Sequence, residues 1–202
     1  MCTGIGAYAG FRGIRILFAT AAFACQVATA QILFDFDSAP VHASLPVYLT
    51  ADGVTGYFSY LSAYNYGFSI QPADTLGFTP AGFAGNVIYP NSIYPADLLV
   101  SFNLTLSDFS IMFAPEEYGC DTSATMRVTG YLDGNYVATN TAIAPFPGTW
   151  PTGTLTLTAP QGFNNVVVHY ALAPTCTDYG PIFMADNMYV TPLDRIFANG
   201  FE

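Results

Sequence analysis

The sequence predicts an all-β protein, specifically an antiparallel β-sandwich. Apolar and polar residues alternate with a period of two over short segments, as at Leu98, Val100 and Phe102. This pattern is typical of antiparallel strands that have one face packed and one face in water. Turn residues separate the segments, and no long segment repeats its apolar residues every 3.6 positions. About ten short strands at this spacing favour a sandwich.

The predicted strands follow one another through most of the chain. Asp52-Gly53 and Asp133-Gly134 lie between two neighbouring pairs of them and indicate tight hairpins. Residues 61–97 lack a clear pattern, and we expect them to form one long excursion across the sandwich. The predicted strands cover residues 31–36, 47–50, 56–60, 98–106, 109–113, 125–132, 136–140, 154–158, 163–172 and 182–190.

The first 30 residues have the features of a secretory signal peptide. Arg12 and Arg15 precede a short apolar run, and Ala28-Thr29-Ala30 is a small-residue cleavage site. We therefore expect cleavage after Ala30, a sandwich domain over residues 31–191 and a C-terminal tail over residues 192–202. The mature protein would be secreted or held at the cell surface, with no membrane span. An uncleaved anchor and a lipid on Cys25 are the alternatives.

The charge of the mature chain excludes some partners. It would keep all 14 acidic residues but only Arg127 and Arg195 as basic ones, so its net charge would be −12. A chain without lysine has little capacity to contact phosphates, which argues against nucleic acid and anionic membranes as partners. The acidity favours solubility and the binding of cations.

Two cysteines remain after the leader. Cys120 and Cys176 each lie in a polar, turn-like context. A pair of cysteines in an exported chain is typical of a disulfide, which would tie two loops together. A pair of metal-binding thiols is the alternative, but there is no histidine cluster nearby to complete such a site.

Several segments resemble a known group of proteins. Phe34-Asp35-Phe36-Asp37, residues 183–190, Gly130-Tyr131-Leu132-Asp133-Gly134 and residues 150–155 resemble bacterial extracellular jelly-roll domains. Such domains occur among carbohydrate-binding modules and among exported proteins with C-terminal sorting signals. The resemblance implies a jelly-roll sandwich. Residues 194–202 resemble a short terminal tag of exported proteins, although a surface peptide docked on the domain is equally compatible.

The same resemblance implies a structural calcium ion. Its ligands would be Asp35 or Asp37 near the first strand and Asp186 of the closing Asp-Asn pair. Asp35 and Asp37 are two residues apart, so on a strand both carboxylates would project from one face. Calcium accepts several oxygen ligands in a flexible geometry. The alternative is that the three aspartates are solvated edge residues and a turn cap.

Aromatic residues provide candidates for binding a ligand. Tyr57 lies in a Tyr-rich segment, and Trp150 stands in a Pro-Gly loop. Exposed rings of this kind could stack on sugars, and an extracellular glycan is the leading ligand class. The alternative, which the context of Trp150 favours, is that these rings close the rim of the core.

No catalytic pattern stands out. Glu116 and Glu117 are adjacent and would point to opposite faces of a strand, so they could not act together as a glycosidase pair. His42 and His169 are the only histidines, and no nucleophile motif accompanies them. The sequence therefore predicts a secreted, non-enzymatic sandwich that binds carbohydrate or other cell-surface partners. A structural or adhesive surface protein and a glycan-active hydrolase are the alternatives.

Overall fold

The computed structural model describes residues 31–116, 124–144, 150–173 and 181–193. These residues form ten β-strands and no helix, so none of them belongs to an apolar helix of membrane-spanning length. The strands are β1 (Ile32–Phe34), β2 (Val47–Ala51), β3 (Val54–Leu61), β4 (Phe68–Pro72), β5 (Asn86–Pro90), β6 (Asp97–Pro115), β7 (Thr125–Leu132), β8 (Asn135–Ile143), β9 (Gly153–Leu172) and β10 (Phe183–Pro192).

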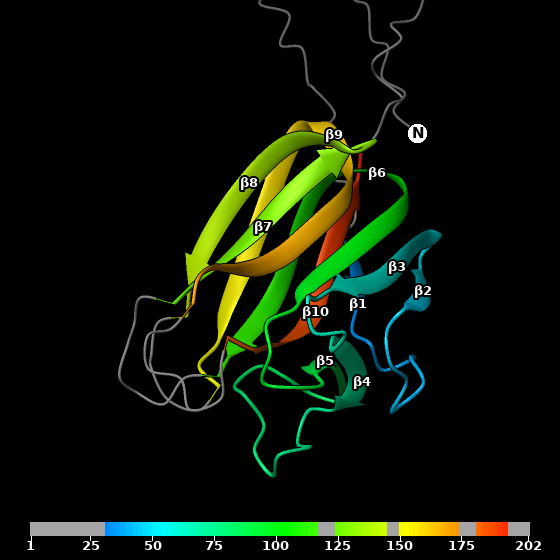
Figure 1. The fold of residues 1–202 in the computed structure, drawn as a ribbon. Coiled ribbons are helices and arrows are strands. Elements are labelled where there is room, and N and C mark those ends of the chain that lie inside the picture. The colour runs from blue at the N-terminus through cyan, green and yellow to red at the C-terminus, as the bar shows by residue number, and fades with distance from the viewer. Residues whose placement is uncertain (1–30, 117–123, 145–149, 174–180, 194–202) are drawn as a thin grey trace, which may run out of the picture.

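The strands form two packed layers (Figure 1). One layer has the order β2-β3-β6-β9-β7-β8 and uses the N-terminal half of β6 and the C-terminal half of β9. The other layer has the order β4-β5-β10-β6-β9 and uses the opposite halves, while β1 also pairs with β10. All of these pairings are antiparallel, so the predicted antiparallel β-sandwich is confirmed.

The two layers are joined by the bends of β6 and β9, which are visible at the top of Figure 1. The pairing of β6 is irregular between Ser101 and Asp108, as expected where a strand changes sheets. In β9 the bend contains Gly162, whose φ is 81°. A Cβ atom there would collide with the side chain of Thr105, so this corner requires glycine.

Aromatic rings fill the space between the layers. The ring of Phe58 on β3 lies 5.9 Å from that of Phe34 and 5.3 Å from that of Phe36. Similarly, the ring of Phe68 on β4 lies 5.2 Å from that of Phe183 on β10. All five side chains are almost completely buried, and rings of this size contribute much of the apolar area that stabilises a core.

Most of the predicted strands are confirmed, with three corrections. Asp52 and Asp133 have φ values of 45° and 50°, and both predicted hairpins form at these turns. Residues 61–97 are not a strand-free excursion, because they contain β4 and β5. The predicted strands 98–106 and 109–113 form one strand, β6, and the predicted strands 154–158 and 163–172 form one strand, β9. Asp35 and Asp37 lie beyond the end of β1, because Phe36 between them has a left-handed φ of 63°.

The alternation of β6 generates a prediction about stability. Leu98 is completely buried between the layers, whereas its neighbour Leu99 lies half-buried on the outer face. We expect Leu98→Ala to lower the free energy of unfolding by about 3 kcal/mol, because the core cannot close fully over the cavity. Leu99→Ala is the matched control and should cost much less. Urea denaturation measures both, and equal losses would contradict this packing.

Candidate functional site

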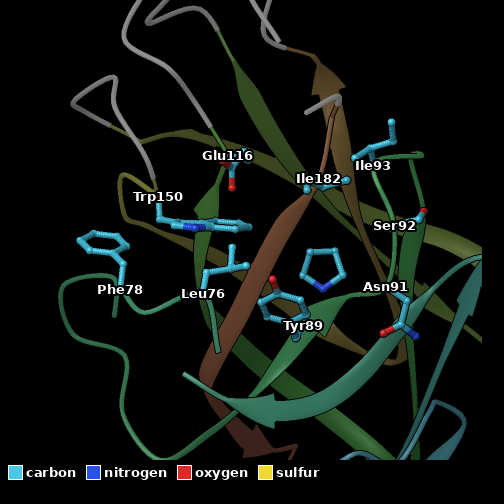
Figure 2. Close-up of a pocket in the computed structure, with 10 residues that line it drawn as sticks. Leu76, Phe78, Tyr89, Asn91, Ser92, Ile93, Glu116, Trp150 and Ile182 are labelled. Carbon is cyan, nitrogen blue, oxygen red and sulfur yellow. The ribbon is translucent and has the colours of Figure 1, made fainter. Parts of the chain in front are cut away.

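A pocket of about 480 Å³ lies at one end of the sandwich, and we call it the end pocket. Figure 2 shows Trp150, Leu76 and Phe78 on one side of it, Asn91, Ser92 and Ile93 on the other, and Tyr89 between them. Its lining is mainly apolar with a few polar groups, which is typical of sites for small molecules. The lining residues are Leu76, Phe78, Tyr89, Pro90, Asn91, Ser92, Ile93, Glu116, Trp150 and Ile182.

The ends of four strands, namely β5, β6, β9 and β10, and the connection between β4 and β5 place these residues together. Leu76 and Phe78 belong to the connection between β4 and β5, and Tyr89 lies near the end of β5. Glu116 follows β6 directly, and its backbone N–H donates a hydrogen bond of 3.0 Å to the carbonyl of Ile182. The pocket therefore joins segments that are far apart in the sequence.

Trp150 forms the inner wall of the end pocket. Its side chain is only 3% exposed and packs in a small apolar cluster with Phe83, Val87 and Met184. Its φ is 59°, in the left-handed region that a bulky residue rarely adopts. Backbone conformations of this kind are often found at functional sites. Trp150 thus belongs both to the core and to the pocket.

Glu116 and Tyr89 are the main polar groups inside the end pocket. The Glu116 side chain is 4% exposed. Burial raises the pKa of the Tyr89 hydroxyl, and the negative charge of Glu116 raises this pKa further. Tyr89 therefore stays protonated at neutral pH and keeps an O–H group that can donate a hydrogen bond. The amide of Asn91 adds a further polar group at the rim.

Tyr57, the other predicted ligand-binding residue, lies elsewhere. It is half-buried on the outer face of β3, and its ring centroid is 4.6 Å from that of Tyr48. The structure therefore separates Tyr57 from Trp150. Tyr89, Phe78 and Glu116 instead accompany Trp150, and no motif in the sequence relates these residues to one another.

The three predicted calcium ligands approach one another near the start of β5. Asp186 is 1% exposed, and its carboxylate accepts hydrogen bonds from the backbone N–H groups of Ala84 at 3.2 Å and Asn187 at 2.7 Å. Asp37 accepts a hydrogen bond of 2.7 Å from the backbone N–H of Asn86. A Cβ on Gly85 would collide with the Asp37 carboxylate, so the glycine permits this approach.

Burial raises the pKa of Asp186 to about 6, because it disfavours the charged carboxylate. The two backbone hydrogen bonds lower this pKa, while the charges of Asp37 and Asp35 raise it. The three carboxylates thus lie within range of mutual repulsion. Even so, no three Asp, Glu, His or Cys side chains in the described part of the chain are grouped as a set of metal ligands.

Several predicted features lie outside the described residues. These are the cleavage site at Ala30, the proposed disulfide between Cys120 and Cys176, and residues 194–202. They stay predictions. At the start of the predicted tail, β10 continues to Pro192, and the N–H of Leu193 donates a hydrogen bond of 2.9 Å to the carbonyl of Thr105.

Comparison with known proteins identifies the fold. No protein-family model and no curated protein matches the chain. The K2 cleaved adhesin domain of Lys-gingipain is 12% identical, with a TM-score of 0.50 over 80% of this chain and 98% of that domain. The K1 domain from Porphyromonas gingivalis W83 is 15% identical, with a TM-score of 0.46 over 81% of this chain and 98% of that one. The likeness to K2 confirms, at the level of the fold, the expected resemblance to bacterial β-sandwich domains.

The raised pKa of Asp186 generates a prediction about pH. A carboxyl whose pKa is higher in the folded state than in the unfolded state stabilises the fold at low pH, and this contribution is lost as pH rises through the folded pKa. In the presence of a chelator, we therefore expect the Tm to fall by a few degrees between pH 5 and pH 7. Asp186→Asn should flatten this dependence, whereas the exposed control Asp74→Asn should not. Calorimetric melting at several pH values measures it, and identical slopes for Asp186→Asn and the unmodified protein would rule the explanation out.

Proposed function

We propose that this protein is a secreted, non-catalytic β-sandwich that binds an extracellular glycan in the end pocket. The main observation behind this proposal is that the end pocket combines apolar walls with several hydrogen-bonding side chains. The side chains of Leu76, Phe78 and Ile93 are 58%, 46% and 52% exposed, so a ligand can reach them. Glu116, Tyr89 and Asn91 offer acceptors and donors beside them.

This combination suits the chemistry of a sugar. A pyranose ring has an apolar face of C–H groups that packs on flat or aliphatic side chains, and hydroxyl groups around its edge that need hydrogen-bond partners. The carboxylate of Glu116 accepts hydrogen bonds from such hydroxyls, and the Tyr89 hydroxyl both donates and accepts them. Trp150 fixes the wall against which the apolar face would pack.

The composition of the end pocket supports a binding role over hydrolysis. Glycoside hydrolysis uses two carboxyl groups about 5–10 Å apart across a cleft. Among the described residues that line the pocket, Glu116 is the only carboxylate. One acid can hold a sugar hydroxyl, but it does not supply the pair that this reaction requires.

Adhesion through an exposed aromatic surface is the second candidate function. Tyr94 stacks on Tyr64 with ring centroids 4.3 Å apart and lies 6.0 Å from Tyr66. These three rings are between 43% and 53% exposed. Such a surface fits a protein partner, and the neighbour of similar fold is named as an adhesin domain.

Binding to an array of uncharged oligosaccharides, followed by titration calorimetry with the strongest ligand, tests the glycan proposal. We expect saturable binding that Phe78→Ala and Glu116→Gln each weaken about tenfold or more, the range that losing a buried contact gives. Tyr48→Ala, which removes a 72% exposed ring that does not line the pocket, should bind as the unmodified protein does. Binding of an uncharged glycan that survives both pocket substitutions, or no binding to any uncharged glycan, would contradict the proposal and favour adhesion.

We also propose that a structural calcium ion binds near Asp35, Asp37 and Asp186. The buried carboxylate of Asp186 and the two like charges beside it support this, since a cation would relieve their repulsion. The donors are all oxygens, as calcium prefers, and backbone carbonyls would have to complete the ligand set.

Calorimetric titration of chelator-treated protein with calcium chloride tests this second proposal. We expect saturable heat and a rise in Tm, because a ligand that binds only the folded state stabilises it. Asp37→Asn should reduce both effects, while Asp74→Asn should leave them unchanged. A Tm that is insensitive to both calcium and chelator would refute the calcium site.

A further inference from the structure

A second concave site lies on the outer face of the layer formed by β3, β6, β9, β7 and β8, and we call it the outer sheet face. It encloses about 490 Å³ and shares no lining residue with the end pocket. Side chains from neighbouring strands form rows across it, because strand pairing brings register partners side by side. The first row runs through Leu61, Asp97, His169 and Arg127.

Arg127 is the feature that defines the chemistry of this face. The sequence contains no lysine, and Arg127 is the only arginine among the described residues. Its Nε is buried without a hydrogen-bond partner, the only such side-chain nitrogen or oxygen in the described part of the chain. A buried N–H donor that lacks a partner costs free energy that an added acceptor would recover.

The acid in this row, Asp97, faces the histidine. The carboxylate of Asp97 lies 3.9 Å from Nδ1 of His169, and His169 is the register partner of Arg127. Burial raises the pKa of Asp97, and the proximity of His169 lowers it. Asp97 therefore faces His169 and leaves Arg127 as a cation without an ion-pair partner among the described residues.

Two tyrosines lie at the other end of the same face. Tyr136 on β8 is 63% exposed, and its ring is 6.5 Å from that of its partner Tyr131 on β7. Tyr131 is four residues from Arg127 along β7, which corresponds to about 13 Å. Sugar rings extending from the tyrosines toward Arg127 would span this distance, and Thr129 and Thr139 lie between.

We propose that the outer sheet face binds an acidic oligosaccharide whose carboxylate pairs with Arg127 while another of its rings packs on Tyr136. The guanidinium offers a planar fork of N–H donors that matches a carboxylate in two parallel hydrogen bonds. The ring of Tyr136 supplies the apolar contact. This site selects for a charged sugar, whereas the end pocket needs none, so it does not depend on the function proposed above.

Titration calorimetry with two acidic sugars and their uncharged forms tests this assignment. The probes are trigalacturonate and sialyllactose, each compared with its methyl ester, which keeps the sugar rings and removes the charge. We expect at least one acid to bind the unmodified protein ten times or more tighter than its ester. Arg127→Gln should abolish this preference, and Arg127→Lys should keep part of it, because lysine retains the charge but not the fork.

Further measurements distinguish binding at the outer sheet face from the alternative explanations. Phe78→Ala, which alters only the end pocket, should leave the preference for the acid unchanged. Equal binding of acid and ester, no binding of either acid, or a preference that survives in Arg127→Gln would overturn the proposal. A sulfated galactose oligosaccharide that binds more tightly than both acids would overturn the assignment to a carboxylate. The comparison of acid with ester uses the unmodified protein, so it remains decisive even if a variant folds poorly.

Discussion

The apolar contact between the two layers is the interaction on which the rest of this structure depends. β6 and β9 cross from one layer to the other and contribute buried side chains to this contact along their whole length. Because each strand serves both layers, each also links the two candidate sites. Asp97 begins β6 and Glu116 follows its end, while Trp150 precedes β9 and His169 lies near its end. The packing that holds Leu98 and Phe113 in the core therefore fixes the side chains of both sites relative to one another.

The sequence was sufficient to predict the fold class because most strands have one wet face. In β6 and β9 the alternation of apolar and polar residues is plain, and the hairpin at Asp133 carries its own turn signal. β4 and β5 escaped prediction for a physical reason: Phe68, Ser69 and Ile70 are consecutive buried residues, as are Val87 and Ile88. Without alternation, and with proline at the end of each strand, such segments look like irregular connections. The bends of β6 and β9 were not predicted, because each of these strands continues through an irregularity that separates two predicted strands.

The candidate sites were harder to predict than the fold. Trp150 could be selected as a lone tryptophan, but its companions Tyr89, Phe78 and Glu116 come from three other parts of the chain and share no motif. Arg127 drew attention only through its rarity among the basic residues. Its importance depends on two facts that only coordinates reveal, namely that its Nε has no partner and that Asp97 faces His169. In a chain this acidic, a cation without a partner or a buried carboxylate indicates a candidate site. Such groups can be located only when the packing of the strands is known.

Trp150 has a consequence for how the molecule can be observed. It is the only tryptophan in the chain, so it is the sole source of indole fluorescence. Its ring is shielded from water and lies 6.4 Å from that of Tyr89 in the wall of the end pocket. The tryptophan emission of the protein therefore reports on one end of the sandwich and not on the molecule as a whole. A signal from this ring follows local opening at the end pocket, while the outer sheet face, with its tyrosines, remains spectroscopically separate.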